Sequence, residues 1–194
     1  MRYDIDRGND ALVIVDVQRD FCSTGALPVA GGDEIVPVLN KYARKFSRAK
    51  AFVVATKDWH PRNHVSFIEY GGMWPSHCVK RTTGARFHPG LKIPRGTTII
   101  PKGTSPSEEA YSAFDGTDLE QELKARCIGR LFVGGLATDY CVKRTVLDAL
   151  GLGFNVVLLE DAIRGVDINP KDSEKAVEEM LTKGAKKSTL SDLH

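Results

Sequence analysis

The chain alternates short apolar runs with segments of helical periodicity, and this alternation limits the folds open to it. The apolar runs are continuous and rich in β-branched residues, as strands buried on both faces are. Clear runs occupy residues 11–16, 51–56, 97–102, 130–136 and 154–161, and a short sixth strand is expected near 187–190. Strands alternating with helices predict a doubly wound, Rossmann-like α/β fold, in which a mainly parallel sheet of about six strands carries helices on both faces.

Helical patterns connect these runs, and residues 1–194 are expected to form one domain. The predicted helices cover 35–46 after an N-cap at Asp33, 119–127 after Thr117 or Asp118, the segment from Thr138 or Asp139 to about Gly151, and 170–184. Residues 57–95 differ, because His, Pro, Gly and Trp recur there without a clean period. An irregular loop of that length inside a compact domain is usually functional.

Charge and cysteine content exclude several classes of protein. The net charge of +2, from 27 basic and 25 acidic side chains, gives no electrostatic reason to bind nucleic acid or an anionic membrane. The 4 cysteines form no C-x-x-C pair, which is typical of a reduced, cytoplasmic protein. The N-terminus is too polar for a signal peptide, and no apolar run approaches the ~20 residues that span a bilayer. Whether the protein forms a homo-oligomer is left open.

Side chains with useful chemistry follow four of the predicted strands. Asp16, Asp58 and Lys102 end their strands, and residues 137–141 follow the strand at 130–136. In a doubly wound sheet, ligands bind beyond the carboxyl ends of the strands. These positions are therefore expected to meet at one edge of the sheet and to form a site there.

Cys141 is the candidate nucleophile of this site. It is expected in the first turn of a helix, where backbone N–H groups and the helix dipole lower the pKa of a thiol. A thiol with a carboxylate and an ammonium group is a complete nucleophilic set. Asp16 would take the proton, Cys141 would attack and Lys102 would stabilise negative charge. Cys22 and Cys78 are expected to be replaceable without loss of activity.

A second group of residues predicts a metal site. Asp58 and His60 lie two apart, so both side chains face the same way in extended backbone. His77 completes a set of two imidazoles and one carboxylate, and His64 is a further candidate ligand. Such a set suits zinc, and also manganese or iron(II), and leaves a position for water or substrate. His88 has no obvious partner and is interpreted as structural.

Two further interpretations of these residues remain at this point. A non-catalytic metal-binding protein would explain the histidines but would give Cys141, Asp16 and Lys102 no reason to coexist. A non-haem iron oxygenase also uses two histidines and a carboxylate, but it has no need of Cys141 and would be richer in β-structure.

The motifs, taken in order, resemble those of the nicotinamidase/pyrazinamidase branch of the isochorismatase-like cysteine hydrolases. They are V-D-V-Q-R-D-F-C, K-D-W-H-P-R-N-H-V-S-F, W-P-S-H-C-V, P-K-G, A-Y-S-A-F-D-G and G-G-L-A-T-D-Y-C-V, and they cover nearly the whole chain. Each motif alone is modest, but their succession is highly specific.

The resemblance implies a role for each residue. Asp16 matches the general base, Lys102 the catalytic lysine and Cys141 the nucleophile. Asp58, His60 and His77 match the metal ligands, while His64 matches a histidine that is a ligand in only some members. The substrate pocket is implied to include Phe21, Trp74, Tyr111, Leu136 and Ala137. Leu136–Ala137 matches a cis peptide that turns the Ala137 N–H inward, beside that of Cys141, as an oxyanion hole.

The implied activity is hydrolysis of nicotinamide to nicotinate and ammonia through a Cys141 thioester, in NAD salvage, with pyrazinamide also accepted. The nearest rival is an amidohydrolase of the same fold that acts on a carbamoyl or ureido compound. Proteins of that kind resemble this chain in Asp, Lys and Cys but generally lack the metal ligands, so the D-W-H and W-P-S-H motifs argue against it.

Overall fold

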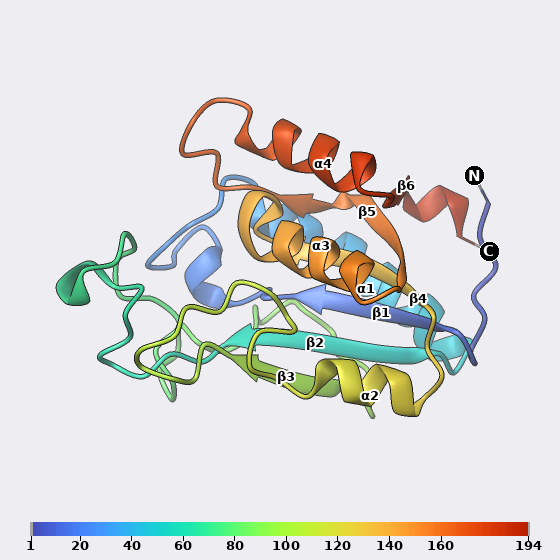
Figure 1. Cartoon of the computed structure of the whole chain (residues 1–194), viewed down its shortest axis with the longest axis horizontal. Coiled ribbons are helices and arrows are strands. Elements are labelled where there is room, and N and C mark those ends of the chain that lie inside the picture. The colour runs from blue at the N-terminus through green and yellow to red at the C-terminus, as the bar shows by residue number, and fades with distance from the viewer. Residues whose placement is uncertain (1, 194) are drawn as a thin grey trace.

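The computed structural model describes residues 2–193 and contains one six-stranded sheet in which every neighbouring pair is parallel. The strands are β1 (Asp10–Val15), β2 (Phe52–Asp58), β3 (Thr98–Lys102), β4 (Arg130–Leu136), β5 (Asn155–Arg164) and β6 (Lys186–Ser188). Their order, β3-β2-β1-β4-β5-β6, reverses between β1 and β4 (Figure 1). This order confirms the predicted doubly wound fold. The predicted domain of residues 1–194 includes Met1 and His194, which lie outside the described residues.

Helices cover both faces of the sheet (Figure 1). On one face lies α1 (Ile35–Arg48), and on the other lie α2 (Leu119–Ala125), α3 (Lys143–Gly151) and α4 (Asp172–Thr182). Each face has its own apolar core: Leu12 and Ile14 of β1 join the core that includes α1, whereas Val13 and Val15 join the opposite core. Because every residue of β1 is buried, its sequence after Asp10 is a continuous apolar run rather than an alternating one.

Of three predicted helix starts, two differ from the structure and one, at Asp118, is confirmed. Asp33 lies inside a 3₁₀ turn, Gly32–Glu34, and makes no capping hydrogen bond to α1; its carboxylate accepts the Ser23 N–H instead, at 2.9 Å. Asp118 takes the N-cap position of α2 without a capping hydrogen bond from its side chain. The last helix begins at Asp172 rather than 170, because Lys171 is left-handed, with a φ of 72°.

Long connections gather at the carboxyl edge of the sheet. Residues 59–97 join β2 to β3 and contain one short 3₁₀ turn, Ile68–Tyr70 (Figure 1). Isolated bridges between His60 and Val79 and between Phe67 and Trp74 order this segment from within. Between residues 2 and 193, no helix has both the length and the apolarity to cross a membrane.

Candidate active site

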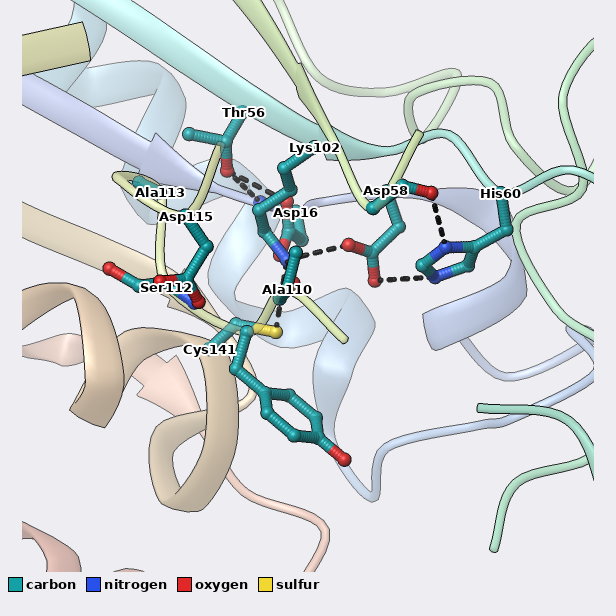
Figure 2. A network of polar contacts seen from close by, with 12 residues as sticks. Asp16, Thr56, Asp58, His60, Lys102, Ala110, Ser112, Ala113, Asp115 and Cys141 are labelled. Carbon is teal, nitrogen blue, oxygen red and sulfur yellow. Dashed lines mark hydrogen bonds and ion pairs between the residues drawn. The ribbon is translucent and has the colours of Figure 1, made fainter. Parts of the chain in front are cut away.

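The ammonium group of Lys102 joins the residues predicted to meet at this edge. Its Nζ lies 2.9 Å from Asp16 Oδ2 and 2.6 Å from Asp58 Oδ1, and it donates to Cys141 Sγ at 3.4 Å (Figure 2). A fourth contact goes to the carbonyl oxygen of Ala110, at 3.0 Å. Lys102 is only 1% exposed. A buried ammonium is stable only when it is paired, and here two carboxylates provide the pairing.

Asp16 is held in place from the neighbouring strand. It follows β1 with a left-handed φ of 48°, and its Oδ1 accepts the Thr56 hydroxyl at 2.7 Å. The same hydroxyl oxygen accepts the Asp16 N–H at 3.2 Å. The other carboxylate oxygen, Oδ2, is buried and has no hydrogen bond of good geometry apart from its ion pair. Cys141 Sγ lies within 4.8 Å of a carboxylate oxygen of Asp16, so Asp16 is placed to accept the thiol proton.

Cys141 lies in a π-helical turn, Thr138–Val142, rather than in the first turn of an α-helix. The Val142 N–H donates to the Ala137 carbonyl five residues earlier, at 3.0 Å, and α3 begins only at Lys143. Such wide turns are rare and are frequently found at functional sites. The preceding Leu136–Ala137 peptide is cis, as the resemblance implied.

The expected low pKa of the Cys141 thiol is wrong for this structure. Burial raises the pKa of Cys141 well above its usual value; Lys102 lowers it, but Asp16 and Asp58 raise it further. The thiol is buried, at 7% exposure, and two carboxylates lie beside it, and neither feature is visible in the local sequence. The raised pKa favours the protonated thiol at neutral pH, so a base beside the sulfur is needed before it can act as a nucleophile.

The two carboxylates differ in their affinity for that proton. Burial raises the pKa of Asp16 to about 6, against the lowering effect of Lys102. Burial also acts to raise the pKa of Asp58, but the charge of Lys102 is the largest opposing cause, and the pKa lies below its usual range. For Lys102 itself, the two carboxylates overcome burial and raise the pKa. Asp16 is thus suited to exchange a proton near neutral pH, while Asp58 remains an anion.

This difference predicts the acid limb of the pH profile. Because the pKa of Asp16 is raised to about 6, its carboxylate form predominates above that pH and is lost below it. We expect kcat/KM to fall about tenfold for each pH unit below 6. Bound metal must be assayed at each pH, since acid also protonates histidine ligands. A flat profile down to about pH 4.5, with metal content constant, would rule out a base with this pKa.

Asp58, His60 and His77 form a cluster suited to a divalent cation. One ligand atom from each lies within 4.8 Å of the others. The Nδ1 atoms of His60 and His77 face the carbonyl oxygens of Gly103 at 3.0 Å and Pro75 at 2.8 Å. A carbonyl only accepts, so each Nδ1 carries the proton and each Nε2 presents a lone pair. Asp58 Oδ2, 3.6 Å from His60 Nε2, is the carboxylate oxygen not taken by Lys102.

Gly103 allows His60 to approach the backbone this closely. Its φ is +59°, and a Cβ at this position would lie 2.4 Å from His60 Cε1. Any side chain there would displace the imidazole from the carbonyl that orients it. In the P-K-G motif, Gly103 thus orients a candidate metal ligand, while Lys102 donates to the Cys141 sulfur.

His64 lies against this cluster without a free ring nitrogen. Its Nδ1 lies 2.7 Å from the Ser66 hydroxyl oxygen and its Nε2 lies 3.1 Å from the Glu108 carbonyl oxygen. The ring centroid is 4.0 Å from that of His60. His64 therefore packs against His60 and does not join the cluster of facing donor atoms, which consists of Asp58, His60 and His77.

Gln18 is a site residue that the sequence interpretation missed. Its buried side chain accepts the Asp58 N–H at 2.7 Å and donates to the Asp58 carbonyl oxygen at 2.8 Å and to that of Ala85 at 3.0 Å. These contacts hold the backbone of Asp58 as a neighbouring strand would. The sequence feature that could have indicated this role is the polar, uncharged Gln18 just after the buried strand, in the V-D-V-Q segment.

Aromatic side chains enclose a cavity next to these groups. Phe21, Trp74, Tyr111 and Ala137 line it together with Cys141 and the three candidate metal ligands. Trp74 Nε1–H donates to the Tyr111 hydroxyl at 2.9 Å, and Tyr140, which the sequence interpretation missed, packs against Trp74 with ring centroids 4.9 Å apart. Leu136 does not line the cavity, because its side chain is fully buried in the core on the α1 face.

A thiol beside a carboxylate and an ammonium group, at the ligand-binding edge of a doubly wound sheet, is the arrangement of a hydrolase that forms a covalent intermediate. The family model that describes the isochorismatase domain matches residues 10–192. The chain therefore belongs to the isochorismatase family.

Individual relatives agree with this assignment. The nicotinamidase of Escherichia coli (strain K12) is 42% identical over 203 residues, which cover 94% of this chain and 95% of that protein. The pyrazinamidase of Pyrococcus horikoshii, solved in complex with zinc, has a TM-score of 0.90 and 50% identity, with 94% of this chain and 99% of that chain covered. PnC1 from L. infantum, solved in complex with nicotinate, has a TM-score of 0.93 and 36% identity, and the match covers 100% of this chain and 99% of that chain.

Proposed function

We propose that this protein is a nicotinamidase, which hydrolyses nicotinamide to nicotinate and ammonia through a Cys141 thioester and also accepts pyrazinamide. The observation that carries the proposal is the convergence of Asp16, Lys102 and Cys141 with the histidine–aspartate cluster in one aromatic cavity. The names of the relatives support the same reaction. We further propose that residues 1–194 act as one domain, in NAD salvage in the cytoplasm.

The first half of the reaction uses the polar contacts around Lys102. The pyridine ring binds between Phe21 and Trp74, with the carboxamide next to Cys141. Asp16 accepts the thiol proton as the sulfur attacks the amide carbon. The N–H groups of Ala137 and Cys141 hold the oxyanion, and the Lys102 ammonium offsets the negative charge that moves between Asp16 and the sulfur.

The second half reverses the direction of proton transfer. Protonated Asp16 donates to the amide nitrogen, the C–N bond breaks and ammonia leaves, so that a nicotinoyl thioester remains on Cys141. Water then attacks the thioester while Asp16 accepts a proton from it. The C–S bond breaks, the sulfur regains a proton from Asp16, and the product leaves as nicotinate after its carboxyl group loses a proton to solvent.

A divalent cation would be held by Asp58, His60 and His77, with Asp58 binding through Oδ2 because Oδ1 is taken by Lys102. The donor atoms fit zinc first, and manganese or iron(II) also. When bound, the metal supplies a Lewis acid that attracts the ring nitrogen of the substrate and lowers the pKa of a bound water. Asp58 remains an anion beside Lys102, and so it keeps a lone pair available for the cation.

His77→Ala is expected to lower the metal content by one equivalent and to raise KM more than it changes the reactivity of Cys141, because the imidazole contacts the cation rather than the sulfur. Metal content by mass spectrometry and alkylation of Cys141 by iodoacetamide give the two readouts. His64→Ala is the matched control and should keep its metal, since both nitrogens of His64 face protein groups. Full occupancy in His77→Ala would remove His77 from the ligands.

The proposed function is tested by ammonia release from nicotinamide and from pyrazinamide. Wild-type protein should release ammonia from both, EDTA-treated protein should lose this activity and regain it with Zn²⁺, and Cys141→Ala should be inactive. A carbamoyl compound and a ureido compound serve as alternative substrates. Release from one of these, with none from nicotinamide after metal is restored, would replace the proposal with the rival amidohydrolase.

A further inference from the structure

A second cluster of metal-binding side chains lies outside the active site. The Sγ of Cys22, a carboxylate oxygen of Asp33 and a ring nitrogen of His88 lie within 4.8 Å of one another. The expectation that His88 has no partner is wrong, because its Nε2 is 3.2 Å from Asp33 Oδ1. We infer that Cys22, Asp33 and His88 form a second, structural binding site for zinc or a cation of similar preference.

The chemistry of the donors favours zinc over the alkaline-earth cations. One sulfur, one imidazole nitrogen and one carboxylate oxygen are ligands that zinc accepts together, whereas calcium and magnesium prefer oxygen alone. The 3.2 Å between His88 Nε2 and Asp33 Oδ1 is close to the separation of neighbouring ligands around a tetrahedral ion with bonds of ~2.0–2.2 Å. Three protein ligands leave the fourth position to water.

The surroundings orient these ligands and leave a path for the ion. Asp33 Oδ2 accepts the Ser23 N–H at 2.9 Å, so Oδ1 is the oxygen that faces His88. The side chains of His88 and Asp33 are 21% and 42% exposed, while Cys22 is buried beneath them. An ion can therefore enter from solvent and reach a thiol that is itself shielded.

One hydrogen bond must change when the cation binds. The Gly90 N–H donates to His88 Nδ1 at 3.1 Å, so the neutral ring without a cation carries its proton on Nε2, towards Asp33. A cation on Nε2 replaces that proton, and the ring then carries one on Nδ1. Gly90 is exposed and has no side chain, so its amide can turn towards water. Cys22 also gives up its thiol proton to solvent, and the metal–sulfur bond forms in its place.

The position of the cluster suggests what the ion does. Cys22 directly follows Phe21 of the substrate cavity, Asp33 lies in the turn before α1, and His88 belongs to the segment between β2 and β3. A bound ion would join these three segments behind one wall of the cavity. A structural role is expected, in which the ion raises the melting temperature and activity persists without it at moderate temperature.

Cobalt(II) as a spectroscopic probe separates this site from the active site. A thiolate bound to Co²⁺ gives a sulfur-to-metal charge-transfer band in the near ultraviolet, which carboxylate and imidazole ligands do not give. We expect wild-type protein dialysed against Co²⁺ to hold two equivalents and to show this band. Cys22→Ser should hold one equivalent and lose the band, and His88→Gln should also hold one. Cys127→Ser, which changes an exposed cysteine, is the control and should match wild type.

Cys141→Ala identifies the sulfur that gives the band. Cys141 is also close to two carboxylates, Asp16 and Asp58, and is a second thiol that a cation could reach among residues 2–193. The band should survive in Cys141→Ala. A single equivalent in wild-type protein, a band lost with Cys141→Ala, or a stoichiometry unchanged in both Cys22→Ser and His88→Gln would each overturn the inference.

Discussion

Replacing Cys141 with alanine is expected to abolish turnover while leaving nicotinamide binding intact. Only the sulfur that attacks the amide is lost, and the cavity and candidate metal ligands stay as they are. Removal of a nucleophile of this kind lowers kcat by about four orders of magnitude or more. Ammonia release gives the rate, and quenching of tryptophan fluorescence, to which Trp74 of the cavity contributes, gives the dissociation constant on addition of nicotinamide.

The control for this experiment is Cys127→Ser, which changes an exposed cysteine. Its kcat and dissociation constant should both equal those of the wild type. Turnover in Cys141→Ala within about tenfold of wild type would exclude the thioester mechanism. In that case the search for a nucleophile would turn to Cys78, which is buried and whose carbonyl oxygen accepts the His60 N–H.

Asp16→Asn is expected to be as damaging to turnover as the loss of Cys141, because the base and the nucleophile act as a unit. The amide side chain keeps the shape of aspartate and the contact with the Thr56 hydroxyl, but it cannot accept the thiol proton. The same substitution should make the resting thiol more acidic. Asp16 is one of the groups that raise the pKa of Cys141, and without its charge Lys102 is opposed by Asp58 alone.

Two readouts should therefore move in opposite directions. Ammonia release by Asp16→Asn should fall by about four orders of magnitude, while alkylation of Cys141 by iodoacetamide near neutral pH should become faster. If Asp16 instead served to hold a preformed thiolate, alkylation would slow as turnover fell. Thr56→Val, which removes only the hydroxyl bonded to Asp16, should have a much smaller effect on turnover.

Much of the fold follows from local features of the sequence. The strands are continuous apolar runs because both faces of the sheet are covered, and a buried strand leaves that pattern in its own residues. The convergence of Asp16, Asp58 and Lys102 follows from the geometry of parallel strands, whose carboxyl ends share one edge. No contact between distant side chains had to be known to place these three together.

Other features depend on contacts that no local pattern encodes. The pKa of Cys141 is raised because burial and two carboxylates act on it, and two of those three causes come from other strands. His64 contacts Ser66 and Glu108, and these contacts depend on irregular segments that carry no periodic pattern. Sequence spacing alone therefore did not decide whether His64 is a metal ligand. Asp33 looked like a cap in the sequence, but its carboxylate turns to Ser23 and His88 in the structure.

The close approach of Gly103 to His60 has a consequence for protein engineering and for the reading of genetic variants. In a saturation library selected for activity, position 103 should tolerate no other amino acid, since even alanine would put a methyl group 2.4 Å from the imidazole. The position would score like a catalytic residue although it contributes no functional group. Substitutions at position 103 would therefore be recorded as loss-of-function variants, and their cause would be a steric clash with His60 rather than the loss of a functional group.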